Sequence, residues 1–267
     1  MKSVPTGRAR KEYWQMLCER SGAGLQFITV YFNMLRSYMF IPDGWQTSEC
    51  IQLDKQNGKE GTKGIRLINL LCPLGKAFFK LVQEDQPDKP FHFGYGFYKN
   101  RRREQPLFIH HAVTVRIRQH VQDLNQRENN RWSHITSFRD ISNAFPSLSH
   151  AAMDSILQSS PDHNEKNFQM LRHRYHHLNM SISTNQGTSI LLRPGCGGAQ
   201  GDVGMPTLFR QTYEPILEEW QTDKREQLEG YIIGRNPTTQ AQIEVTATVY
   251  ADDIKENNMT QNAAEDI

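Results

Sequence analysis

The chain has 267 residues, of which 37% are hydrophobic and 22% are charged, and its formal net charge at pH 7 is +2. This length fits one large domain or two small ones. The balanced charge excludes a highly charged disordered chain and a global electrostatic attraction to nucleic acid. No run approaches the ~20 apolar residues of a membrane span, so we expect no membrane association. The charged N-terminal stretch argues against a secretory signal, and scattered cysteines without a CxxC pair favour reduced, intracellular thiols.

The N-terminal part of the chain is expected to form a helix and a hairpin. Apolar residues recur every three or four positions over 14–39, which predicts a helix that Gly22 and Gly24 weaken. Thr47–Leu53 and Gly64–Leu70 read as two short strands around an Asn-Gly turn, so they predict a hairpin.

The middle of the chain predicts alternating helices and loops. Pro73 can open a helix, and a loop rich in Pro and Gly follows over 82–106. A helix of about twenty residues begins near Leu107. A strand is expected to end near Asp140, and Ser147 can cap the helix that comes next.

The C-terminal part adds further helices, strands and a glycine-rich loop. A helix is expected from about Glu165 to His176, and Met180–Thr184 with Thr188–Arg193 predicts a second hairpin. A helix over Met205–Trp220, kinked by its internal proline, precedes a strand over Glu244–Tyr250. This irregular alternation favours an α+β fold over a regular βαβ series.

The strongest chemical signal is the acid pair Asp252-Asp253 at the end of the last strand. Adjacent carboxylates repel each other unless a cation holds them. An oxygen-only site of this kind suits Mg²⁺ or Mn²⁺. The alternative is an Asp-Asp turn between two strands, because Asp is a common turn residue.

Two weaker signals precede the acid pair. Asp140 lies at a strand end and is followed five residues later by Phe145, although a lone Asp there is more often a cap or turn residue. The glycine-rich segment Gly195–Gly204 leads directly into an apolar helix, where glycine permits a close backbone approach to a ligand. Its alternative is a flexible linker.

The order of these segments resembles the reverse transcriptases, most closely the non-LTR (LINE-type) retrotransposon group. Asp140 with Ala144 and Phe145 is similar to the first palm motif, D-x-x-x-A-F. Gln200-Gly201-Asp202 resembles the second palm motif, and Tyr250-Ala251-Asp252-Asp253 matches the third, Y-A-D-D. Two upstream segments, around Arg66 to Lys76 and around Gly96 to Arg101, resemble finger motifs.

The resemblance implies the fingers and palm of a right-hand polymerase, with an antiparallel palm sheet backed by helices and with the thumb missing. It divides the chain into an N-terminal helical extension (1–40), a fingers-like region (41–132), a palm with the three catalytic motifs (133–255) and a truncated polar tail (256–267). The chain is then expected to be part of a longer polyprotein with an endonuclease and a thumb, acting in the nucleus.

The resemblance also implies RNA-directed DNA polymerase activity. Two Mg²⁺ or Mn²⁺ ions would support nucleotidyl transfer from a dNTP to a DNA primer 3′-hydroxyl on an RNA template. Asp140 and Asp252 would coordinate both ions, Asp253 would support the site or ligate more weakly, and the carbonyl of Ile141 could complete one shell.

Other residues receive binding roles by the same resemblance. Phe145 would exclude a ribose 2′-hydroxyl, and the alternative is that it is simply a core residue. The remaining nucleotide-binding candidates are Arg66, Lys76, Gln200, Gly201 and Tyr250. The nucleic-acid-binding candidates form the densest basic run, Lys99, Arg101, Arg102 and Arg103, whose alternative is a solvated charged loop.

The sequence departs from the family pattern at several points. Pro146 stands where the family often has a second acid, and Leu67 replaces the finger proline. Lys255 to Asn258 are polar where the returning palm strand is usually apolar. An inactive retrotransposon remnant that retains the fold, and perhaps nucleic-acid binding, is therefore the alternative. An intron-like or domesticated reverse transcriptase is a third reading.

Overall fold

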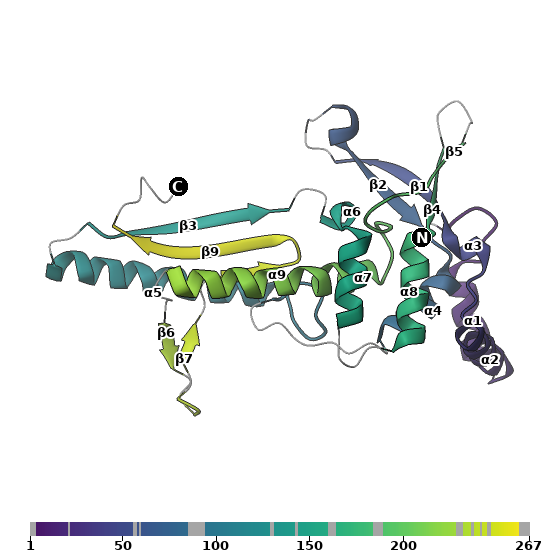
Figure 1. Ribbon diagram of the computed structural model, residues 1–267, viewed down its shortest axis with the longest axis horizontal. Coiled ribbons are helices and arrows are strands. Elements are labelled where there is room, and N and C mark those ends of the chain that lie inside the picture. The colour runs from purple at the N-terminus through teal and green to yellow at the C-terminus, as the bar shows by residue number, and fades with distance from the viewer. Residues whose placement is uncertain are drawn as a thin grey trace. The chain divides into compact units, whose positions relative to one another are not determined.

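The computed structural model describes residues 4–20, 22–55, 58, 60–84, 94–128, 131–141, 144–159, 164–183, 189–227, 232–235, 238–240, 242–244 and 247–261 (Figure 1). The chain divides into two compact units. Unit 1 comprises Met1–Asp88 and Asn143–Thr212, and unit 2 comprises Lys89–Ser142 and Tyr213–Ile267. Each unit therefore combines two stretches of chain, whereas the predicted fingers and palm are contiguous. The predicted division at residue 133 stays a prediction.

Unit 1 begins with two helices, α1 (Lys11–Arg20) and α2 (Gly22–Tyr38), where the sequence predicts one helix over 14–39. The two helices pack closely at Gly24. A Cβ atom there would overlap the backbone carbonyl of Leu17, so only glycine fits this approach. The glycines that weaken the helical pattern thus mark the break between two packed helices.

A mixed sheet runs through unit 1 in the order β2-β1-β4-β5. Strands β1 (Thr47–Asp54) and β2 (Ile65–Leu70) form the predicted antiparallel hairpin. Strand β1 also pairs in parallel with β4 (Asn179–Ser183), which pairs antiparallel with β5 (Ser189–Leu192). The short helices next to β1 and β2 are α3 (Asp43–Gln46) and the 3-10 helix η1 (Gly61–Gly64).

The helices of unit 1 mostly follow the sequence. Helix α4 (Pro73–Glu84) begins at the predicted proline, and α8 (Glu165–His176) has the predicted bounds. The helix expected to begin at Ser147 is instead two helices, α6 (Ala144–Ser147) and α7 (His150–Ser159). Ser147 ends α6, where its hydroxyl donates to the carbonyl of Ala144 at 3.0 Å. It does not cap α7, because that helix begins three residues later.

The main sheet of unit 2 is antiparallel, in the order β3-β9-β8. Its strands are β3 (Ser133–Asp140), β8 (Ala247–Tyr250) and β9 (Asp253–Thr260). Helix α5 (Glu104–Glu128) and the unit 2 part of α9 (Met205–Gln227) bury apolar side chains against it, and both run beside β9 in Figure 1. The predicted α+β class is thereby confirmed.

Strand β9 forms in spite of its polar sequence. Glu256 is 2% exposed and accepts hydrogen bonds from Ser137 and Arg139 on the neighbouring strand, at 3.3 and 3.2 Å. Asn257 is 3% exposed and its side-chain oxygen accepts from the hydroxyl of Thr136 at 3.2 Å. Polar side chains satisfy one another across the sheet, so the strand does not need an apolar sequence.

The strand predicted over 244–250 is described in two parts, because residues 245 and 246 lie outside the described residues. Strand β7 (Gln242–Glu244) pairs with β6 (Ile232–Arg235), and β8 begins at Ala247. Across the described residues, the helices include none that is both long and apolar enough to cross a membrane.

Candidate active site

The acid pair lies at the tip of the β8–β9 hairpin. Tyr250 pairs with Asp253, so Ala251 and Asp252 form a two-residue turn between the strands. Ala251 has φ of 60°, a left-handed conformation usually taken by Gly, Asn or Asp in such turns. The tight turn delivers both carboxylates to one end of the sheet.

Asp140 lies directly across from this hairpin. It ends β3, and its partner in the β3–β9 register is Asp253. Directly opposed residues on antiparallel strands point to the same face, with Cβ atoms about 4.5–5.5 Å apart. The fold therefore brings together two carboxylates from distant parts of the sequence, with Asp252 adjacent in the turn.

These carboxylates act on one another electrostatically. The pKa of Asp253 is raised, first by partial burial and then by the negative charges of Asp252 and Asp140. The charge of Asp252 also helps to raise the pKa of Tyr213, for which burial is the larger cause. Like charges gathered at one end of a sheet favour a bound cation.

The donor chemistry of this cluster fits a divalent cation, because its side chains offer only oxygen. In the described part of the chain, however, three or more His, Cys, Asp or Glu side chains do not converge closely enough to enclose a metal ion. Mg²⁺ is usually held by one or two carboxylates together with substrate phosphates. The opposed pair Asp140 and Asp253, with Asp252 beside it, suits that open kind of site.

Tyr250 and Ile141 adjoin the carboxylates. Tyr250 is 39% exposed and faces the same way as its cross-strand partner Asp253. Ile141 follows β3 directly and is half-buried. The metal-binding role of the Ile141 carbonyl and the nucleotide-binding role of Tyr250 stay predictions.

One of the predicted finger segments packs against the hairpin. Gly94 bridges to Val249, and the backbone N–H of Tyr95 donates to the carbonyl of Val249 at 2.8 Å. A Cβ atom on Gly96 would overlap the backbone nitrogen of Ala251. Glycine at this position thus allows the segment to support the turn that carries Asp252.

The basic run divides into anchored and exposed side chains. Arg101 hydrogen-bonds the carbonyl of Gly94 and lies over the rings of Tyr98 and Tyr95, 4.6 and 5.4 Å from their centroids. Those contacts tie Arg101 to the segment that supports the hairpin. The side chains of Lys99, Arg102 and Arg103 are exposed, and Arg103 pairs with Glu104 at 3.3 Å.

The glycine-rich loop lies in unit 1 and is fixed to β2. The carbonyl of Gln200 accepts the backbone N–H of Asn69 at 2.8 Å. Gly201 has φ of 114°, and a Cβ atom on it would lie 2.8 Å from the carbonyl oxygen of Asn69. Asn69 is itself held, because its side chain accepts hydrogen bonds from Ser48 and Cys50. Only glycine at position 201 fits this loop conformation.

Three further candidates also lie in unit 1. Phe145 is half-buried, packs against a hydrophobic cluster and meets Phe209 edge-on at 5.5 Å. Arg66 is exposed on β2, and Lys76 is half-buried in the first turn of α4. Their nucleotide-binding roles stay predictions.

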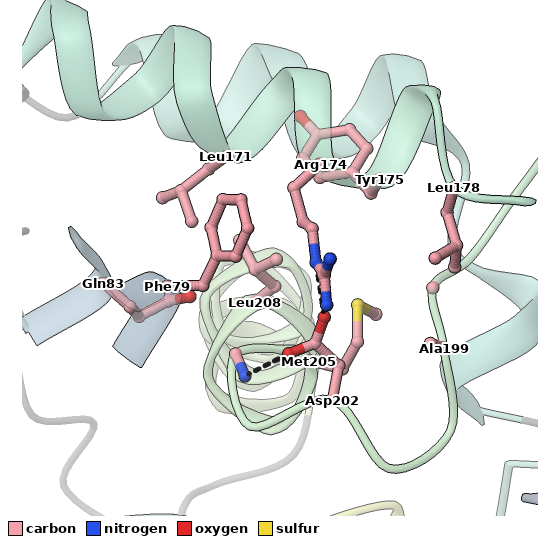
Figure 2. A pocket seen from close by; sticks show the side chains of 12 residues that line it. Phe79, Gln83, Leu171, Arg174, Tyr175, Leu178, Ala199, Asp202, Met205 and Leu208 are labelled. Carbon is pink, nitrogen blue, oxygen red and sulfur yellow. Dashed lines mark hydrogen bonds and ion pairs between the residues drawn. The ribbon is translucent and has the colours of Figure 1, made fainter. Parts of the chain in front are cut away.

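Sequence reasoning missed the partner of Asp202. Arg174 on α8 pairs with this aspartate at 3.0 Å, and both side chains are more than nine-tenths buried (Figure 2). The sequence signal for a buried partner is the place of Arg174 on its helix, because it lies on the same face as the buried Leu171 and Tyr175. A charged residue on a buried stripe requires a buried partner.

Comparison with solved structures finds similar folds in telomerases. Apo telomerase from Candida tropicalis, truncated from its C-terminal domain, gives a TM-score of 0.51 at 10% identity, covering 90% of this chain and 50% of that one. Telomerase from Candida albicans in complex with a fragment of telomeric RNA gives 0.50 at 10%, covering 87% and 42%. The corresponding Candida tropicalis complex gives 0.52 at 9%, covering 91% and 41%.

The chain therefore has a reverse-transcriptase-like fold, and it spans half or less of the telomerase chains that it matches. No protein-family model matches it, and no curated protein matches it.

Proposed function

We propose that this chain is the fingers and palm of an RNA-directed DNA polymerase that transfers nucleotides from dNTPs to a primer 3′-hydroxyl. The observation that carries the proposal is the pairing of Asp140 with Asp253 across β3 and β9, with Asp252 in the adjoining turn. The reverse-transcriptase-like fold supports the same assignment.

In this proposal, Asp140 and Asp252 hold two Mg²⁺ or Mn²⁺ ions, and Asp253 supports them. When bound, such ions neutralise phosphate charge and lower the pKa of the attacking hydroxyl. The protein positions the reactants and presents its carboxylates already in place, which avoids reorganisation during the reaction.

The substrates in this proposal are an RNA template, a DNA primer and a dNTP. By the motif resemblance, Gln200 and Gly201 take part in binding the nucleotide, and the exposed Lys99, Arg102 and Arg103 contact backbone phosphates. The order of the motifs suggests an origin in a LINE-type retrotransposon. The RNA that two of the similar telomerases carry is consistent with an RNA ligand.

Primer extension on poly(rA)/oligo(dT) with Mg²⁺ or Mn²⁺ tests the activity. Asp252→Asn should reduce incorporation by on the order of 100-fold or more, because a charge-stabilising group is lost. Asp123→Asn is the matched control, since Asp123 is an exposed aspartate on α5 in the same unit. Equal incorporation by wild type and Asp252→Asn would refute the assignment.

The second candidate is an inactive remnant that keeps the fold. The observation in its favour is that the described residues include no convergent group of three metal-binding side chains. Binding of Mn²⁺, followed by paramagnetic broadening of the NMR signals of Ala251 and Ile254, separates the two. Broadening that disappears in Asp252→Asn favours the polymerase, whereas no broadening and no incorporation favour the remnant.

A further inference from the structure

The Arg174–Asp202 pair lies at the base of the glycine-rich loop. The Nε atom of Arg174 donates to Oδ2 of Asp202 at 3.0 Å, and the two side chains are 6% and 9% exposed. Figure 2 shows Arg174 reaching from α8 to Asp202, which comes from the loop just before α9. The pair thus joins the buried face of α8 to the loop that contains Gln200 and Gly201.

Arg174 is itself fixed by two other elements. Its guanidinium donates to the carbonyl of Trp45 on α3 and lies 4.6 Å from the centroid of the Phe79 ring on α4. A planar guanidinium held by a carbonyl, a ring and a carboxylate has little freedom to reorient. The contacts with Trp45 and Phe79 therefore hold the guanidinium in the position from which it binds Asp202.

Asp202 links Arg174 to the loop through hydrogen bonds to two loop residues. Its backbone N–H donates to the carbonyl of Ala199 at 2.9 Å, and Oδ1 accepts the backbone N–H of Gly204 at 3.3 Å. The first contact closes a turn around Gln200 and Gly201, and the second closes one around Val203. Both oxygens of the carboxylate therefore take part in holding the loop.

Apolar packing alone does not hold the loop at this place. A cavity lies beside the ion pair, bordered by Gln83, Leu171, Met205 and Leu208 among others (Figure 2). The amide of Gln83 is buried there without a hydrogen-bond partner. Because the packing is incomplete, directional contacts select the loop position. The buried ion pair is one of them, together with the hydrogen bond from Asn69 to the carbonyl of Gln200.

We propose that Arg174 is a positioning residue, which acts through Asp202 to hold Gln200 and Gly201 in place for the incoming nucleotide. This inference rests on the proposed polymerase function for the identity of the ligand. The ordering of the loop by Arg174 is a separate claim, which can be measured without any activity.

Amide hydrogen exchange on the whole chain tests the ordering. In Arg174→Met, exchange of the backbone amides over 197–204 should rise about 10- to 100-fold, because Asp202 is left buried without its partner. Arg172→Met is the matched control, since Arg172 lies on the same helix and pairs with Asp154, with its side chain 46% exposed. A uniform rise throughout unit 1, or no rise in the loop, would overturn the proposal.

A conservative variant covers the case in which Arg174→Met does not fold. Asp202→Asn removes the charge and keeps one side-chain oxygen, which can accept from Arg174 or from Gly204 but not from both, because the two donors contact different oxygens of Asp202. It should give a smaller increase in exchange over the same residues, of about 10-fold. Exchange identical to wild type would show that the charge has no part in ordering the loop.

Nucleotide kinetics then test the link to function. In a chain that extends primers, Arg174→Met should raise the KM for dNTP by about 10-fold or more with a smaller change in kcat, and Arg174→Lys should restore part of the loss. An unchanged KM would refute the role in nucleotide placement. Absence of extension by the wild type would refute the polymerase function, while the exchange result would still decide the ordering.

Discussion

At the level of single residues, the pKa of Asp253 reflects its burial and the nearby carboxylates of Asp252 and Asp140. Its raised pKa, caused first by burial and then by Asp252 and Asp140, means that the folded state holds this proton more tightly than the unfolded state. The group therefore stabilises the fold less as the pH rises through the aspartate range. The burial and crowding of this carboxylate thus lower stability at neutral pH.

We expect Asp140→Asn to lower the pKa of Asp253, because it removes a neighbouring negative charge. The free energy of unfolding should rise at neutral pH and should change less at about pH 3, where aspartates are largely protonated. NMR titration of the Asp253 carboxyl carbon and denaturant unfolding measure the two effects. Asp123→Asn serves as the control, and an unchanged pKa of Asp253 would contradict the paired arrangement.

His110 on α5 makes a second residue sensitive to pH. Burial, then the charges of Lys255 and His134, lower the pKa of His110 from 6.5 to about 4. In the unfolded chain, His110 takes up a proton below about pH 6.5. In the folded chain, its imidazole stays neutral until about pH 4. Stability is therefore lost as the pH falls through this window.

Replacing His110 by Asn should remove that dependence. Between about pH 6.5 and 4, wild type should lose up to about 1.4 kcal/mol per pH unit more than His110→Asn. Urea unfolding at a series of pH values measures the difference. A slope in His110→Asn that matches that of wild type would contradict the assignment.

At the level of elements, local patterns predicted much of the secondary structure. The hairpin of β1 and β2, the start of α4 at Pro73 and the bounds of α8 depend on nearby residues, and all three are confirmed. The parallel pairing of β1 with β4 joins segments more than a hundred residues apart, which no local pattern encodes. Strand β9 was hard to recognise because its buried polar side chains have their partners on other elements.

The candidate site divides in the same way. The acid pair and Asp140 could be found because a strand followed by carboxylates is a local signal, and the register then shows that they meet. The Arg174–Asp202 pair could not be found, because it depends on how α8 packs against a loop 28 residues further along the chain. The roles of Arg66, Lys76 and the basic run depend on ligands and stay predictions.

The contact of Gly96 with the β8–β9 hairpin leads to a prediction about this element. Gly96→Ala should destabilise unit 2 by about 1–3 kcal/mol and displace the turn, because the new Cβ would overlap the backbone of Ala251. Gly195→Ala is the matched control, since no atom lies within 4 Å of a Cβ there. Thermal unfolding and the NMR shifts of Ala251 and Asp252 measure the effect, and equal behaviour of the two variants would contradict it.

At the level of the whole molecule, the hydrophobic clusters follow the two units. Leu171 belongs to a cluster with α2 and α4 residues of unit 1, whereas Leu217 packs with Val249 and Ile254 of unit 2. Each cluster has its buried members within one unit. Because burial of apolar side chains is the main source of cooperativity, the two units should respond separately to loss of core packing.

Matched leucine substitutions test this expectation. Leu171→Ala and Leu217→Ala each truncate a leucine that is 3% exposed, so each should cost about 2–5 kcal/mol. Native-state hydrogen exchange should accelerate in unit 1 for the first variant and in unit 2 for the second, with the other unit nearly unchanged. Each variant is the control for the other. Equal acceleration of both units in both variants would mean that the chain unfolds as one cooperative body, so that damage to the loop of unit 1 would also loosen the carboxylates of unit 2.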